Sequence, residues 1–159
     1  MNISFGEHKG KSVAEVILKH PDYVKWVLEK NDATGELLTT QNEMIKLIDI
    51  FNSKPFTKKC RGNNCVKTSI MCTARKEDYS GLYWWCDKCY HYENVIYTDV
   101  HHIIRSYQDA LSYVANICKN RKEDYVGLIK RLAEEKGLKK RATKNDIEKF
   151  FLPAGILTF

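Results

Sequence analysis

Apolar residues in the first third of the chain recur at the three- and four-residue spacing of amphipathic helices. Three such stripes predict three short helices, over residues 13–17, 23–27 and 44–51. Ser12 and Thr40 each stand three residues before a glutamate. This is the pattern of a capping box, and it predicts where the first and third helices begin.

A short strand and a turn are expected ahead of these helices. Residues 3–5 have strand character, and Gly10 permits the tight turn of a hairpin. Tyr23 and Trp26 fall on one helical face, which predicts that both rings pack in a core and do not serve as a ligand platform. Residues 1–53 are therefore expected to form a small hairpin-plus-helices module.

The middle of the chain changes to patterns that are typical of strands. Residues 66–72 and 82–85 are rich in β-branched and aromatic side chains, and the polar stretch 76–81 predicts a hairpin loop between them. Residues 90–98 predict a third strand. The segment 54–98 is therefore expected to be a three-stranded ribbon.

Four cysteines in this segment have the spacing of a metal site. They follow the pattern C-x4-C, twenty residues, C-x2-C, and they are Cys60, Cys65, Cys86 and Cys89. Two close pairs on tight turns can bring four thiolates to one tetrahedral ion, which predicts a structural Zn²⁺ site. Four thiolates would close the coordination shell and leave no position to activate water. Two disulfides or free buried thiols are the alternatives.

Two further residues are possible substitute ligands. Cys72 lies in a predicted strand and not on a cysteine turn, so it is expected to be a core residue, whereas His91 could replace a cysteine. The N-terminus lacks a secretory signal and no apolar run reaches the ~18 residues of a membrane span. The expected location is therefore intracellular and reducing, cytoplasmic or nuclear, without a membrane partner, which favours metal over disulfides.

Helical spacing returns in the last third of the chain. Ser106 and Thr143 are expected helix caps, and Gly137 is an expected helix end. Residues 99–159 are therefore predicted to be a basic helical region. The whole chain is expected to have an α+β fold, with the ribbon between two helical segments.

Positive charge is concentrated in two stretches of a chain whose net charge is +6. Residues 54–76 hold seven basic and no acidic side chains, and residues 119–159 hold eleven basic and six acidic ones. This segregation favours a polyanionic partner such as DNA or RNA, although a solvated lysine-rich face is the alternative. The candidate contacts are cations together with two rings that could stack on unpaired bases. They are Lys9, Lys11, Lys58, Lys59, Arg61, Lys67, Arg75, Trp84, Trp85, Lys139, Lys140 and Arg141.

A sequence motif near the N-terminus adds to this picture. Phe5-Gly6 and Lys9-Gly10, followed by Pro21, Tyr23 and Trp26, form the pattern F-G-x-x-K-G, a helix, and P-x-Y-x-x-W. This stretch, about 30 of the 159 residues, resembles the small domain at the C-terminal end of exodeoxyribonuclease X-like proteins. The resemblance implies an accessory module associated with nucleic acid. The metal-binding carboxylates of the exonuclease part have no counterpart here.

Together these features predict a non-enzymatic, zinc-containing accessory protein that binds single-stranded or non-specific DNA or RNA. The first alternative is a protein-interaction adaptor, in which the ribbon aromatics and the apolar residues 155–159 dock another protein. A second is a small enzyme that uses His101 or His102.

Overall fold

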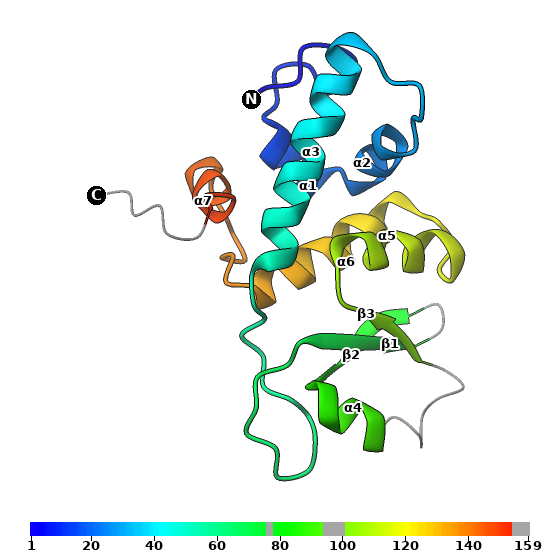
Figure 1. Cartoon of the computed structure of the whole chain (residues 1–159), viewed down its shortest axis with the longest axis vertical. Coiled ribbons are helices and arrows are strands. Elements are labelled where there is room, and N and C mark those ends of the chain that lie inside the picture. The colour runs from blue at the N-terminus through cyan, green and yellow to red at the C-terminus, as the bar shows by residue number, and fades with distance from the viewer. Residues whose placement is uncertain (76–77, 94–100, 154–159) are drawn as a thin grey trace.

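Helices and one small antiparallel sheet make up the protein, which confirms the α+β prediction. The structure is a computed structural model and describes residues 1–75, 78–93 and 101–153 (Figure 1). Its elements are α1 (Val13–Lys19), α2 (Pro21–Leu28), α3 (Gly35–Ser53), β1 (Met71–Arg75), β2 (Asp78–Trp85), α4 (Asp87–Glu93), β3 (His101–Ile104), α5 (Tyr107–Asn116), α6 (Lys122–Glu135) and α7 (Lys144–Phe150).

Helices from both ends of the chain share one hydrophobic core. α1, α2 and α3 pack against α5, α6 and α7, and Figure 1 shows both sets on the same side of the sheet. The buried hydroxyl of Tyr107 in α5 donates a hydrogen bond of 2.7 Å to the carbonyl of Ile17 in α1. Its ring meets Phe51 of α3 edge to face, with 5.4 Å between ring centres. The division into units at residues 53 and 98 stays a prediction.

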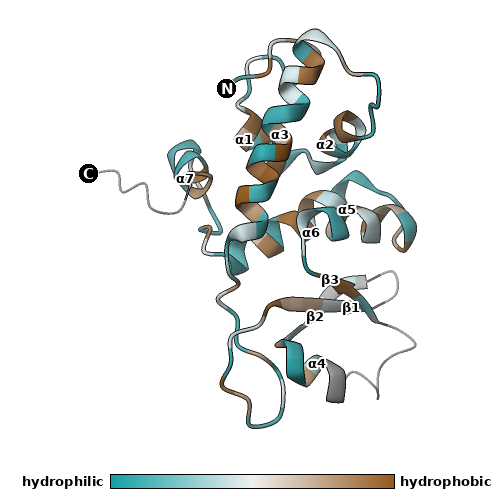
Figure 2. Ribbon diagram, viewed as in Figure 1, coloured by the Kyte–Doolittle hydropathy of each residue, from teal (hydrophilic) through white to brown (hydrophobic). Residues whose placement is uncertain are grey.

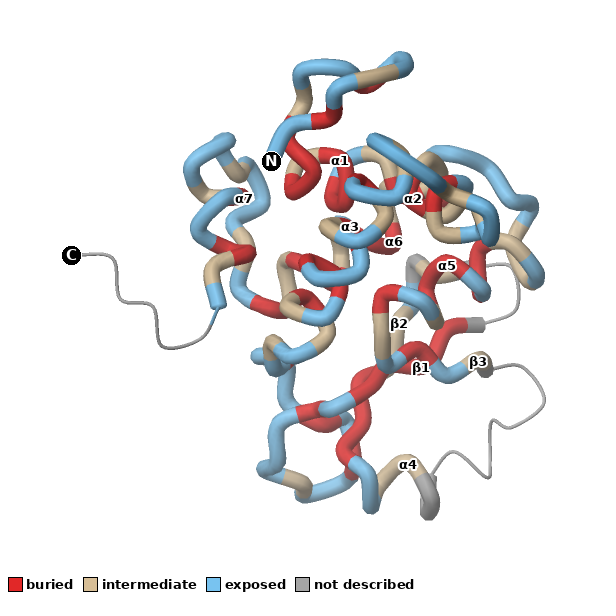
Figure 3. The backbone as a smooth tube through the Cα atoms, turned by 45° about the horizontal axis from the view of Figure 1, so that its top comes forward, coloured by how far each residue is buried: buried red, intermediate tan, exposed pale blue. Residues whose placement is uncertain are grey.

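Burial along α3 follows the amphipathic pattern read from the sequence. Figure 2 shows hydrophobic and hydrophilic segments alternating along this helix, and Figure 3 shows buried positions recurring along it. Met44, Leu47, Ile48 and Phe51 are all buried, whereas Ile45 is exposed. The predicted stripe is therefore the face that packs on the core.

Local capping signals predicted several helix ends correctly. Ser12 Oγ accepts a hydrogen bond of 3.1 Å from the backbone amide of Glu15, at the start of α1. Ser106 and Thr143 both form complete capping boxes, at the starts of α5 and α7. Gly137, just past α6, has a φ of 103°, a left-handed value that suits glycine.

The predicted start of α3 at Thr40 is wrong. The helix begins at Gly35, and Thr40 is a fully buried residue inside it. One reason is tertiary packing: Leu37, in the turn before Thr40, is partly buried against the helical core. The Gln41 side-chain amide also joins α3 to the chain at and after the end of α2, because it donates to the carbonyls of Val27 and Lys30 at 3.0 and 2.9 Å.

The sheet has three strands, but two of them lie elsewhere than predicted. β1 begins at Met71, so residues 66–70 belong to the preceding loop, and β2 already begins at Asp78. Residues 90–93 continue α4, and the third strand is β3, in a segment expected to lead into a helix. Residues 94–98 of the predicted third strand lie outside the described residues. β1 is the central strand, pairing with both β2 and β3.

The prediction that Trp26 packs in the core is also wrong. Its side chain is 46% exposed on α2. The ring stacks on the half-buried Tyr23, with 5.7 Å between ring centres, and the Lys30 ammonium lies 4.6 Å from the Trp26 ring centre. Helical spacing placed both aromatics on one face, but among the described residues no element covers the outer end of that face.

Lys136 connects the helical core to the chain segment that enters the sheet. Its ammonium donates to the Lys54 carbonyl and lies 4.3 Å from the ring centre of Phe56. Burial, together with the nearby charge of Lys54, lowers the pKa of Lys136 from its usual 10.5 to about 8. The folded protein therefore loses this proton at a lower pH than the unfolded chain does.

We predict that replacing Lys136 by Met removes part of the pH dependence of stability. The unfolded chain binds more protons than the native state between pH 8 and 10.5, so the wild-type free energy of unfolding should gain a rising component through this window. Denaturant unfolding at several pH values between 8 and 10.5 gives the free energy of unfolding of both proteins, and the difference between the two curves is this component. The exposed Lys149→Met variant is the control and should follow the wild type. A Lys136→Met curve parallel to the wild-type curve would contradict this account.

Candidate metal centre and basic surfaces

The four predicted cysteines converge in the structure. The sulfurs of Cys60, Cys65, Cys86 and Cys89 all lie within 4.8 Å of one another. The Sγ atoms of Cys65 and Cys86 are 3.9 Å apart, far beyond a disulfide bond, and none of the four is oxidised. Tetrahedral coordination at 2.3 Å requires sulfurs about 3.8 Å apart, so this cluster could hold a metal ion.

Two backbone turns bring the sulfurs together. In the first, the Gly62 amide donates to Cys60 Sγ at 3.3 Å, and the Cys65 amide donates to the Gly62 carbonyl at 3.0 Å. In the second, at the start of α4, the Cys89 amide donates to Cys86 Sγ at 3.4 Å. Amide donors stabilise negative charge on sulfur, which is the form that binds a metal.

Gly62 also lets the two cysteine turns approach each other closely. A Cβ atom at this position would overlap Cys89 Sγ and lie 2.8 Å from Cys89 Cβ. The two turns therefore approach each other across Gly62 with no room for a side chain. The spacing of the cysteines could not show this close approach, because it depends on how the turns face one another.

The protonation of the cluster suits a bound cation. The amide hydrogen bond from Cys89 lowers the pKa of Cys86 to about 7, whereas burial raises the pKa values of Cys60 and Cys89. A cation bound by all four sulfurs would displace the remaining thiol protons, so its affinity should increase with pH.

Cys72 is a core residue, as predicted. It is fully buried in β1, and its thiol contacts the Ile104 carbonyl at 3.8 Å. Burial raises its pKa to about 12, so it stays a neutral thiol. The side chain of His91 lies outside the described part of the chain, and its suggested ligand role stays a prediction.

Exposed cations surround the first turn of the cysteine cluster. Lys58, Lys59, Arg61 and Lys67 are all exposed, and none forms an ion pair with a described residue. The Arg61 guanidinium lies 4.1 Å from the centre of the Tyr83 ring. We call residues 58–67 the basic loop. The side chain of Arg75 lies outside the described part of the structure.

The structure corrects the proposed stacking role of Trp84 and Trp85. Their side chains are only 3% and 2% exposed. Trp84 packs on Phe56 in the helical core, with 5.0 Å between ring centres, and Trp85 donates from its ring nitrogen to Thr73 Oγ1 at 3.0 Å. Neither ring has a face open to a base, and both rings instead pack the sheet against its surroundings.

Lys9 and Lys11 of the N-terminal hairpin have different surroundings. Lys9 is exposed, but the half-buried Lys11 ammonium lies 3.3 Å from both His8 Nδ1 and His20 Nε2. Burial lowers the pKa of both histidines, and the Lys11 charge contributes to each shift. The Lys11 ammonium therefore donates to two neutral histidine rings, and this arrangement does not favour the predicted contact of Lys11 with a phosphate.

Lys139, Lys140 and Arg141 lie on the turn between α6 and α7 and are all exposed. The Lys139 ammonium pairs with Asp146 at 3.5 Å, whereas Lys140 and Arg141 form no ion pair with a described residue. This turn is the second place where the structure gathers predicted cations on the surface.

We predict that a Cys86→Ser variant binds metal at least about 100-fold more weakly than the wild type, because a hydroxyl is a poor substitute for a thiolate. Elemental analysis and competition with a chelator measure the affinity. Cys118→Ser, outside the cluster, is the control and should keep the wild-type metal content. Equal metal content in both variants would exclude the four-sulfur site.

Gly62→Ala should weaken metal binding by about 10- to 100-fold although it removes no ligand, because its methyl group displaces Cys89. Gly81→Ala is the matched control, since nothing lies within 4 Å of a Cβ there. The same competition assay applies. If the two alanine variants bind metal alike, the two turns do not approach each other as described.

No helix within the described residues has the length and apolar character needed to span a bilayer. No curated protein matches the chain, and no solved structure matches it. Residues 3–32, which include the hairpin, α1 and α2, match the family model described as Exodeoxyribonuclease X-like C-terminal. The resemblance read from the F-G-x-x-K-G and P-x-Y-x-x-W motifs is therefore confirmed: the N-terminal segment is similar to the exodeoxyribonuclease X-like C-terminal domain.

Proposed function

We propose that the chain is a non-enzymatic accessory protein that holds one structural Zn²⁺ ion and binds single-stranded or non-specific DNA or RNA. The proposal rests on the four-sulfur cluster, because the turn that holds its first two cysteines carries exposed cations that form no ion pair with a described residue. A tetrahedral set of four thiolates suits Zn²⁺ or an iron–sulfur centre, and Zn²⁺ is the ion that such sites use for structure alone.

The basic loop is the proposed contact surface. The cluster anchors it at Cys60 and Cys65, and the Arg61 amide donates to the Trp84 carbonyl of β2 at 2.8 Å. The loop therefore presents its lysines from a fixed backbone. The Arg61 side chain on Tyr83 adds a flat cationic surface, on which an unpaired base could stack while the lysines meet phosphates.

The N-terminal segment supports the same partner. Its similarity to the exodeoxyribonuclease X-like C-terminal domain favours a nucleic-acid context. In this proposal the segment has no catalytic role. His101 and His102 lie on β3, and the alternative of a small enzyme that uses one of them stays a prediction.

A protein-interaction adaptor is the second candidate, and one observation favours it. Val66 is 83% exposed and Ile70 is 53% exposed, and both lie in the loop beside the cluster. An exposed apolar pair of this kind could dock on another protein. The apolar residues 155–159, which the sequence also suggested for this role, lie outside the described residues.

A salt titration with matched variants tests the nucleic-acid proposal. Wild-type binding to a single-stranded oligonucleotide should weaken as salt increases, and the Lys59→Gln/Lys67→Gln variant should lower the log–log slope by about 1.4, or ~0.7 per lost contact. The control Lys46→Gln/Lys119→Gln removes equal charge at exposed positions elsewhere and should leave the slope unchanged. Metal content and thermal stability must stay equal in both variants.

Two results would contradict the proposal. If wild-type protein retains neither DNA nor RNA at low salt, the adaptor candidate is favoured. If both double variants lower the slope equally, binding follows net charge and the basic loop is not the site.

A further inference from the structure

A second feature of the structure is a pocket between the end of α1, the middle of α6 and the turn that leads into α7. Its volume is about 260 Å³, slightly below the ~300 Å³ at which small-molecule sites usually begin. The floor is aliphatic and includes Leu18, Val126 and Leu138. We call it the basic pocket, because five of the eleven residues that line it are lysine or arginine.

The charged side chains among the described residues that line this pocket are all cations. Two of its cations are partly neutralised, since Lys19 pairs with Glu15 at 3.2 Å and Lys139 pairs with Asp146 at 3.5 Å. The other three, Lys130, Lys140 and Arg141, form no ion pair with a described residue. The pocket therefore complements a ligand that is apolar in its body and anionic at its edge.

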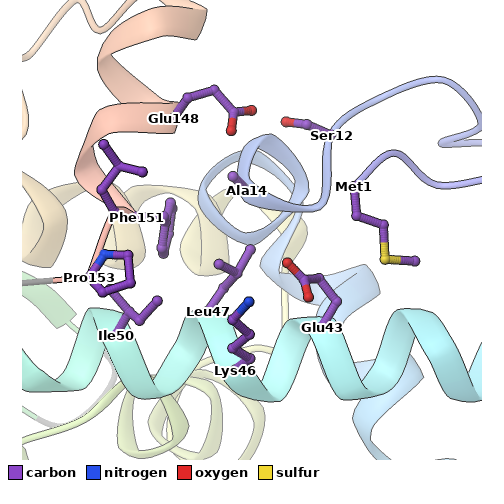
Figure 4. Close-up of a pocket in the computed structure, with 11 residues that line it drawn as sticks. Met1, Ser12, Ala14, Glu43, Lys46, Leu47, Ile50, Glu148, Phe151 and Pro153 are labelled. Carbon is purple, nitrogen blue, oxygen red and sulfur yellow. The ribbon is translucent and has the colours of Figure 1, made fainter. Parts of the chain in front are cut away.

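A neighbouring pocket shows that this charge pattern is not general. It lies between α1, α3 and α7, has a volume of about 190 Å³ and is drawn in Figure 4. Glu43, Glu148 and Lys46 line it together with apolar side chains such as Leu47. Its charges are mixed, so it has no preference for an anion.

We propose that the basic pocket binds one unpaired nucleotide of a nucleic-acid strand, an inference that rests on the nucleic-acid function proposed above. The base lies on the aliphatic floor, and its phosphate meets Lys130, Lys140 and Arg141. A base stacked and paired inside a duplex cannot enter such a pocket, so the site selects single strands or strand ends. Among its described lining side chains, none is an asparagine or glutamine that could read an adenine edge, and the cations are assigned to the phosphate, which carries no sequence information.

The test uses Ala142→Glu, which places a carboxylate at a half-buried loop position that lines the pocket. Ala33→Glu makes the same change at a half-buried loop alanine outside the pocket and is the control. Fluorescence anisotropy then compares a single-stranded oligonucleotide with a blunt duplex of the same sequence. Ala142→Glu should weaken single-strand binding about tenfold and leave duplex binding nearly unchanged, whereas the control should change neither. Equal losses for both nucleic acids would overturn the proposal.

A second measurement separates this inference from the proposed function. In NMR spectra of the wild-type protein, a nucleoside monophosphate should shift the methyl signals of Leu18 and Val126, which inorganic phosphate should not do. If the methyl signals stay in place while the protein binds oligonucleotides, the pocket inference fails and the function stands. If they shift while no oligonucleotide binds, the function fails and the pocket stands as a nucleotide site. Shifts caused by anionic phospholipid vesicles and not by the nucleotide would also overturn the proposal.

Discussion

The structure around the sheet depends on the convergence of four sulfurs. The sheet has only three short strands, and the cysteine cluster joins the loop before β1 to the helix after β2. The buried side chains of this region form a very small cluster of their own, in which Met71 and Trp85 pack beside Cys60 and Cys86. So little apolar surface contributes little free energy, and small modules of this kind usually depend on a metal.

Two consecutive tryptophans join this small cluster to the rest of the protein. Successive side chains of a strand point to opposite faces, so β2 directs Trp84 into the helical core and Trp85 into the cysteine cluster. β2 therefore contacts both the cysteine cluster and the helical core. The basic loop is attached to the same strand through Arg61, so its position depends on both cores.

Features decided by a few neighbouring residues were predictable from the sequence, and features decided by distant contacts were not. The caps at Ser12, Ser106 and Thr143 are local hydrogen bonds. The short spacing within each cysteine pair likewise indicated a metal site. The first turn of α3 packs Leu37 against the helical core, a tertiary contact that no local pattern records. Strand alternation placed Trp84 and Trp85 on opposite faces but could not show that both faces are covered. The unpaired cations of the basic pocket come from α6 and the turn after it, and they meet Leu18 of α1 only because the fold brings these segments together.

The shared core has a consequence for the order in which the chain folds. The contact between Ile17 and Tyr107 spans 90 residues, whereas Cys65 and Cys86 are separated by only 21. Short loops close faster and at lower entropic cost than long ones. During synthesis from the N-terminus, all four cysteines also emerge before α5, α6 and α7 exist. Convergence of the cysteine turns can therefore precede closure of the helical core, and β2 then offers Trp84 as a surface on which the late helices assemble.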